Sequence, residues 1–176
     1  MSLHHCFVAA NKTQQDLSNF DCGKAEMNMF IGRFACKHMG LGLSTTWVLP
    51  DTPEGLIPGN GNLAPIAAYF TLAQNTVDKE SLPVKQSLPR YPIPTVLLAR
   101  LAVDKKYQGQ GIGGKALVTS LRKACELCDM GLPAYGLVLD VLDDNAMGFY
   151  QSYGLFHPLH DNPKRLFVGM KTIRKI

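Results

Sequence analysis

The sequence lacks any long hydrophobic run, and no apolar stretch approaches the ~20 residues that a bilayer-spanning helix needs. It also lacks the apolar N-terminal core of a secretory signal peptide. Charged residues make up only 18% and hydrophobic residues 46%, a balance typical of a folded globular protein rather than a disordered chain. These absences argue against membrane and secreted proteins. At 176 residues, the sequence predicts a single cytoplasmic domain over residues 1–176.

Cysteine is sparse, and its pattern gives neither a disulfide framework nor a metal site. Cys125 and Cys128 form a CxxC pair, but they fall inside a predicted helix and no second pair completes a zinc site. A redox role for this pair would need a preceding strand, which the pattern does not predict. We therefore expect no bound metal and buried, reduced thiols at the five cysteines: Cys6, Cys22, Cys36, Cys125 and Cys128.

The net charge of +4 is small and unevenly distributed. Residues 1–60 carry a net −1, whereas residues 61–110 carry +3 and residues 111–176 carry +2. This basic excess would attract a phosphate-rich ligand to the second half of the chain. It is too small to identify nucleic acid by itself.

Strand and helix patterns alternate along the chain. The predicted strands are 6–10, 44–49, 64–72, 95–103, 137–141 and 165–171. The predicted helices are 24–38, 113–130 and a short one that is capped by Asp143 or Asp144 and ends at Gly154. Turn residues fill 51–61, and four prolines exclude a continuous helix over 78–94. This order indicates an α/β protein with helices on the faces of a sheet.

The segment between the fourth strand and the second helix is rich in glycine. It reads Gln108-Gly109-Gln110-Gly111-Ile112-Gly113-Gly114. Four glycines in six positions remove Cβ atoms, so that backbone N–H groups can approach a ligand closely. The first turn of the following helix adds unpaired N–H donors and the positive end of the helix dipole. The segment is therefore a candidate site for a diphosphate.

Three kinds of phosphate loop compete for this segment. A P-loop needs Ser or Thr after Gly-Lys, but Ala116 follows Gly114-Lys115. A Rossmann loop needs an acidic residue at the end of the next strand, and Asp140 lies about 26 residues beyond Gly114, farther than the usual ~20. The third pattern, Gln/Arg-x-x-Gly-x-Gly/Ala, is met by Gln108, Gly111 and Gly113. An ordinary α/β turn is the alternative without a ligand.

With its surroundings, the third pattern resembles the GNAT N-acetyltransferase superfamily over nearly the whole chain. A strand ending Leu101-Ala102-Val103-Asp104 precedes the loop, and Asn145, Phe149-Tyr150 and Gly154 follow the next strand at the family's spacing. The resemblance implies a single-domain GNAT fold, with a mixed twisted sheet of six to seven strands flanked by about four helices. It also implies acetyl-CoA as the co-substrate.

The resemblance also assigns roles to residues. The edge of Leu101, Ala102 and Val103 would pair with the pantetheine arm, and a kink there would aim an N–H at the thioester carbonyl. Asn145 would hold a pantetheine amide, beside Phe149. The backbone would hold the diphosphate at seven positions, with help from Lys115: Gln108, Gly109, Gln110, Gly111, Ile112, Gly113 and Gly114.

Tyr150 is the expected proton donor to the departing thiolate. The pKa of a tyrosine is near ~10, so its hydroxyl is protonated at neutral pH. The resemblance places the catalytic tyrosine of the family here, and the alternative is a core aromatic. No general base is evident, although His38, His157 and His160 have suitable chemistry. An aminoacyl ester would lessen the need for a base, because its amine is more readily neutral.

A narrower resemblance concerns the acceptor. Asn19-Phe20-Asp21-Cys22-Gly23 and Tyr69-Phe70-Thr71-Leu72 are similar to segments of the GNAT toxins of bacterial type II toxin–antitoxin systems. That resemblance implies acetylation of aminoacyl-tRNA, a ribbon-helix-helix antitoxin partner and a homodimer. Arg33, Lys37 and Arg100 could contact tRNA phosphates, with an ion pair as the other reading of Arg100. The alternatives are an acetyltransferase for a protein or small-molecule amine, and a non-catalytic CoA-binding module.

Overall fold

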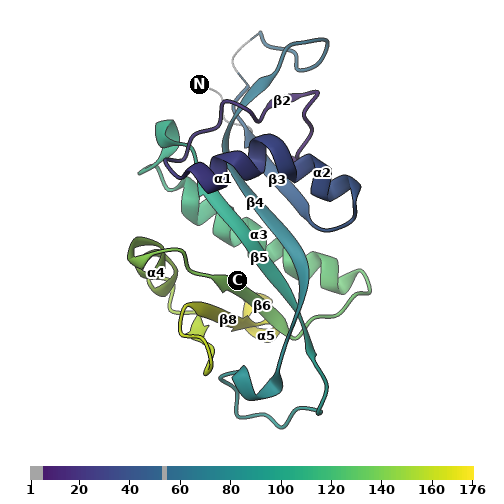
Figure 1. Cartoon of the computed structure of the whole chain (residues 1–176), viewed down its shortest axis with the longest axis vertical. Helices are drawn as coiled ribbons and strands as arrows, with labels where there is room; N and C mark the ends of the chain where they lie inside the picture. The colour runs from purple at the N-terminus through teal and green to yellow at the C-terminus, as the bar shows by residue number, and fades with distance from the viewer. Residues whose placement is uncertain (1–5, 53–54) are drawn as a thin grey trace. The chain divides into compact units, whose positions relative to one another are not determined.

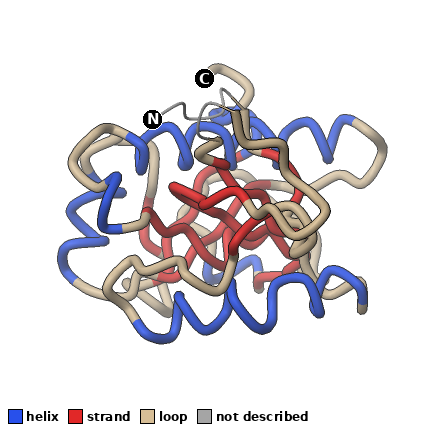
Figure 2. Tube along the Cα trace, turned by 90° about the horizontal axis from the view of Figure 1, so that it is seen from above, coloured by secondary structure: helices blue, strands red, loops and turns tan. Residues whose placement is uncertain are grey.

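The structure is a computed structural model that describes residues 6–52 and 55–176. It contains a mixed sheet with the hydrogen-bonded strand order β1-β3-β4-β5-β6-β8-β7, and β2 pairs with β4 off this path. Figure 2 shows the strands in red and the helices in blue. The elements are β1 (Val8–Ala9), β2 (Gln15–Asp16), α1 (Ala25–Met29), η1 (Phe30–Phe34), α2 (Ala35–Gly40), β3 (Thr45–Pro50), β4 (Ala64–Val77), η2 (Lys79–Ser81), β5 (Ile93–Val103), η3 (Lys105–Tyr107), α3 (Ile112–Asp129), β6 (Gly136–Asp140), α4 (Asp144–Gln151), β7 (His157–Pro158), β8 (Arg165–Gly169) and α5 (Met170–Ile173).

The chain forms two compact units. Unit 1 comprises residues 1–72 and 100–120, and unit 2 comprises residues 73–99 and 121–176. The elements β4, β5 and α3 each contribute residues to both units. The single domain predicted over residues 1–176 stays a prediction.

Unit 1 is built around a helical segment that covers two antiparallel strands. In Figure 1, α1 and α2 run across β3 and β4. Between these helices, η1 is a five-residue π-helix over Phe30–Phe34. The buried face carries Met27, Phe30, Ile31 and Ala35, which pack with Tyr69 of β4. The Tyr69 hydroxyl donates to the Met27 carbonyl oxygen at 2.8 Å, so a strand side chain fixes the helix where it changes geometry.

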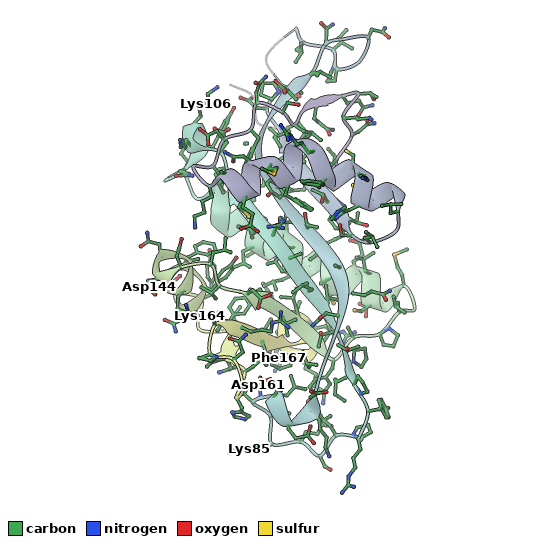
Figure 3. The ribbon with its side chains drawn as sticks, in the orientation of Figure 1. Lys85, Lys106, Asp144, Asp161, Lys164 and Phe167 are labelled. Atoms are coloured by element: carbon green, nitrogen blue, oxygen red, sulfur yellow. The ribbon has the colours of Figure 1, made fainter. Side chains whose placement is uncertain are left out.

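Unit 2 is built around β6. The parallel pairing of β5 with β6 runs from Thr95↔Gly136 to Leu98↔Leu139, and β8 pairs antiparallel on the other side of β6. A Cβ built on Gly136 would collide with the ring of Phe167, labelled in Figure 3, and with the Val168 carbonyl oxygen. Glycine at this position therefore allows β6 and β8 to pack together.

The predicted α/β class is confirmed, but several element bounds differ from the prediction. The strand predicted to end at Lys171 ends at Gly169, because the chain turns into α5 there. The strand predicted over 64–72 continues to Val77. The two-residue strands β2 and β7 left no sequence signal, because they are too short for a periodic pattern. Part of the predicted turn over 51–61, Pro53-Glu54, lies outside the described residues.

The prediction of buried cysteines is correct for Cys128 alone. Cys6 is exposed because it precedes the first strand, and Cys22, Cys36 and Cys125 are half-buried. In the described part of the chain, no helix combines the length and apolar character needed to cross a bilayer.

Candidate active site

The glycine loop joins β5, through the short turn η3, to α3. Gly109 and Gly111 have φ angles of +75° and +78°, a conformation that glycine adopts without strain and other residues do not. A Cβ built on either glycine would have no heavy atom within 4 Å. The glycines are therefore required by the left-handed turn and not by packing, and their outer side is open to a ligand.

The loop leads directly into the first turn of α3, an 18-residue helix. Among the described residues, the backbone bonding of this turn begins with the Lys115 N–H, which donates to the Gly111 carbonyl oxygen at 3.1 Å. The N–H groups of residues 112–114 lie before this bond, at the end of the helix where backbone donors have no intrahelical acceptor. Together with the helix dipole and the exposed Lys115, they form a site suited to an anion.

The two glutamine side chains of the loop bind the protein's own backbone. Gln108 Nε2 donates to the Val103 carbonyl oxygen at 2.9 Å and to the Cys22 carbonyl oxygen at 3.2 Å. Gln110 Nε2 donates to the carbonyl oxygen of Lys106, which is labelled in Figure 3, at 3.1 Å. These bonds hold the loop against the end of β5, and they leave its backbone N–H groups for a ligand.

Asp104, which the sequence analysis did not single out, supports the start of the loop. This carboxylate is buried and accepts hydrogen bonds from the backbone N–H groups of Lys106 and Asp21, each at 2.9 Å. Lys105 in turn pairs with the Asp21 carboxylate at 2.9 Å. The Lys105 ammonium and the N–H groups of Gly23 and Asn28 lower the pKa of Asp21 to about 2. The segment Asn19–Gly23, noted above only for its resemblance, is thus fastened to the loop.

The segment Leu101–Val103 continues β5 beyond its pairing with β6. That pairing ends at Leu98, five residues before the end of β5 at Val103. On its other edge, the backbone follows β4, because the Asp104 N–H donates to the Ala67 carbonyl oxygen at 2.9 Å. The last part of β5 therefore extends past its β6 partner, as a strand that binds an extended ligand along its edge would.

Tyr150 lies on α4 in a cluster of aromatic rings. Its ring centroid is 5.1 Å from that of Phe149 and 5.7 Å from that of Phe156, both edge-to-face. Only 8% of the residue is exposed, and this burial raises the pKa of Tyr150 to about 12. The hydroxyl therefore stays protonated and able to donate at neutral pH. Its pKa lies farther above that of a thiol than does the ordinary tyrosine value of ~10 used in the sequence analysis.

The predicted site residues divide between the two units. Asn145, which is exposed, the half-buried Phe149 and Tyr150 belong to α4 in unit 2. Asp143 is the N-cap of this helix, and its carboxylate accepts from the Ala146 N–H at 2.8 Å. The glycine loop and Leu101–Val103 belong to unit 1. Their assigned roles stay predictions.

The basic residues predicted for the acceptor all lie in unit 1. Arg100 pairs with Glu26 at 3.3 Å, and its guanidinium lies 4.4 Å from the ring centroid of Phe30. The structure therefore contains an ion pair of Arg100, which was the alternative to a phosphate contact. Arg33 and Lys37 are exposed on the helical segment that includes Phe30. That segment thus presents two cations, and Arg100 of β5 adds a third beside Phe30 in unit 1.

Comparison with known proteins identifies the family. Residues 69–154, which run from within β4 through β5 and the glycine loop to just past α4, match the model of the acetyltransferase (GNAT) domain. The chain therefore contains a GNAT acetyltransferase domain over these residues. This acetyltransferase is 27% identical to the tRNA-acetylating toxin of Mycobacterium tuberculosis, over 92% of this chain and 90% of that protein.

Solved structures agree with this assignment. AtaT complexed with acetyl-methionyl-tRNAfMet has a TM-score of 0.83 and 27% identity to this acetyltransferase, over 99% of this chain and 98% of that chain. A tyrosine-to-phenylalanine mutant of KacT has a TM-score of 0.84 and 26% identity, over 99% of both chains. The predicted GNAT fold and acetyltransferase activity are thereby confirmed.

Proposed function

We propose that this acetyltransferase moves the acetyl group of acetyl-CoA to the α-amino group of aminoacyl-tRNA, and acts as a translation-inhibiting toxin in the cytoplasm. The observation that carries the proposal is the open glycine loop at the start of α3, in a chain that matches a tRNA-acetylating toxin over 92% of its length. AtaT, another relative, has been solved with acetyl-methionyl-tRNAfMet.

The loop fits the diphosphate of CoA. Gly109 and Gly111 leave its outer side without Cβ atoms, and the N–H groups of residues 112–114 supply donors at a positive helix end. Gln108 and Gln110 brace the loop with their side chains. The pantetheine arm has alternating amides like those of a strand, and the segment Leu101–Val103 would bind it as a neighbouring strand does.

Tyr150 would donate a hydrogen bond to the sulfur as the thioester breaks. Its pKa of about 12 keeps the hydroxyl protonated near neutral pH. Burial also strengthens a hydrogen bond to a developing charge. The amine must attack in its neutral form. The amine of an aminoacyl ester meets this condition near pH 7 more readily than a lysine amine, whose pKa is ~10.4.

Two further partners belong to the proposal. A ribbon-helix-helix antitoxin would neutralise the toxin, and the chain would form a homodimer. For the tRNA, the exposed Arg33 and Lys37 offer direct phosphate contacts. To contact tRNA, Arg100, whose side chain is only 25% exposed, would leave its ion pair with the exposed Glu26.

The test is incubation of the protein with acetyl-CoA and charged total tRNA, followed by mass identification of the acetylated products. Acetylated aminoacyl ends are the expected result. Acetylated protein or small amines, with untouched aminoacyl-tRNA, would contradict the tRNA proposal while preserving the acetyltransferase. Growth arrest on expression, relieved by a ribbon-helix-helix protein encoded upstream, would support the toxin role.

A further inference from the structure

A buried polar contact lies immediately before the glycine loop. Tyr107 is 4% exposed and Asp51 is 5% exposed, and the Tyr107 hydroxyl donates to Asp51 Oδ2. The Asp51 N–H donates to the Pro65 carbonyl oxygen at 2.8 Å, which fixes the carboxylate at the end of β3 beside β4. The contact therefore joins the rigid strands of unit 1 to the residue that opens the loop.

The same region holds both ends of the loop. Tyr107 and Ile112 are buried in one apolar cluster with Leu49, Ala67 and Ala68. The four residues between them, 108–111, are all exposed. The side chains of Gln108 and Gln110 brace this exposed stretch through hydrogen bonds, and the two buried ends set where it begins and where it finishes. The apolar side chain of Ile112 is held by packing, whereas the Tyr107 side chain also makes a directional hydrogen bond.

Stability alone does not account for a carboxylate at this position. Asp51 Oδ1 is buried and has no hydrogen-bond partner among the described residues. A buried oxygen without a partner disfavours folding, and an apolar pair of similar size would fill the same space without that cost. The carboxylate adds a directional contact. A hydrogen bond to Asp51 fixes the position of the Tyr107 hydroxyl, whereas apolar packing alone would allow the ring to shift within its own plane.

We infer that Asp51 is a positioning residue for the diphosphate-binding loop and acts through the Tyr107 hydroxyl. The bond sets where the chain leaves η3, and so the direction in which the N–H groups of residues 109–114 face the diphosphate. This inference rests on the proposed use of acetyl-CoA. It assigns no contact between Asp51 and the substrate.

The experiment compares two thioesters in the full-length protein. Acetyl-CoA contains the diphosphate, and S-acetylpantetheine lacks it. Asp51→Ala and Tyr107→Phe should each raise the KM for acetyl-CoA about tenfold, the effect of losing one hydrogen bond to a charged group. Neither should change kcat/KM for S-acetylpantetheine. Asp51→Asn, which keeps an acceptor oxygen, should restore the KM for acetyl-CoA to within about threefold of the wild-type value.

Thr71→Val is the matched control. Thr71 and Thr46 form another buried polar pair in unit 1, with their hydroxyl oxygens 2.7 Å apart, and this pair does not adjoin the loop. Its loss should lower the melting temperature without selectively raising the KM for acetyl-CoA.

Three outcomes in the Asp51→Ala and Tyr107→Phe variants would each overturn the inference: an unchanged KM for acetyl-CoA, equal losses with both thioesters, or failure of both variants to fold. The same selective loss in Thr71→Val would also overturn it. If the wild-type protein binds no acetyl-CoA in calorimetry, the proposed function fails first, and that result is distinct from the others.

Discussion

Tyr150→Phe tests catalysis separately from packing, because it removes only the hydroxyl oxygen and keeps the ring. The Tyr150 ring packs edge-to-face on Phe149 and Phe156, and phenylalanine keeps both contacts. With the pKa of Tyr150 near 12, only about one hydroxyl in 10⁵ is ionised at pH 7, so the variant removes a donor that is always present. A positioned proton donor contributes ~10²–10⁴-fold to the rate. We therefore expect kcat to fall at least about 100-fold, or about 2.7 kcal/mol in the activation barrier.

The assay measures kcat, the KM for acetyl-CoA and thermal unfolding in the same preparations. The affinity for acetyl-CoA should stay within about twofold, and the free energy of unfolding should change by less than about 1 kcal/mol, because the substitution leaves the buried area intact. Tyr153→Phe is the control, because Tyr153 carries the other hydroxyl of this cluster. Its ring centroid lies 5.4 Å from that of Phe149, the ring that Tyr150 also contacts. Equal kcat values for wild type and Tyr150→Phe would refute the donor assignment.

The raised pKa of Tyr150 also predicts a pH dependence of stability. Its folded pKa of about 12 lies above the ordinary value of 10.0, so folding favours the neutral hydroxyl. This contribution to stability is fully present below pH 10 and is lost as the pH rises from 10 to 12. Denaturant unfolding over this range should show a shallower loss in Tyr150→Phe than in wild type. Identical slopes would mean that the Tyr150 hydroxyl is not held in a desolvated environment.

Three further predictions concern individual residues. Gly136→Ala should destabilise the protein by about 2–3 kcal/mol, because its Cβ would collide with the Phe167 ring and the Val168 carbonyl; Gly148→Ala, with open space in α4, should stabilise it by about 0.5–1 kcal/mol in the same denaturant titration. The Asp21 carboxyl should titrate near pH 2 by NMR, and its pKa should rise in Lys105→Met. Its contribution to stability is present above pH 4 and is lost as the pH falls towards 2. An unchanged pKa in the variant would exclude Lys105 as the cause. Arg100→Ala should lower kcat/KM for aminoacyl-tRNA without changing acetyl-CoA affinity, whereas Glu26→Gln should not lower it; unchanged tRNA kinetics in Arg100→Ala would remove Arg100 from the acceptor site.

The sequence predicted the loop because its chemistry is local. Left-handed turns at Gly109 and Gly111 need glycine, and a helix must follow for its N–H groups to be available, so both requirements can be seen within ten residues. The cap at Asp143 and the end of α4 at Gly154, which has a φ of +66°, are local in the same way. The π-helix Phe30–Phe34 had no such signal, and the bond from Tyr69 to the Met27 carbonyl just before it joins residues that are 42 apart in the sequence.

What the sequence by itself determined was the α/β order, the glycine loop and the family, since each depends on residues that are neighbours along the chain. The tertiary structure alone decided which side chains support that loop. Asp51 and Tyr107 are 56 residues apart, and Asp21 and Lys105 are 84 apart. It also decided that Arg100 pairs with Glu26 and that the pKa of Tyr150 rises. Contacts and burial between distant segments exist only after the chain has folded, so no local pattern of residue types records them.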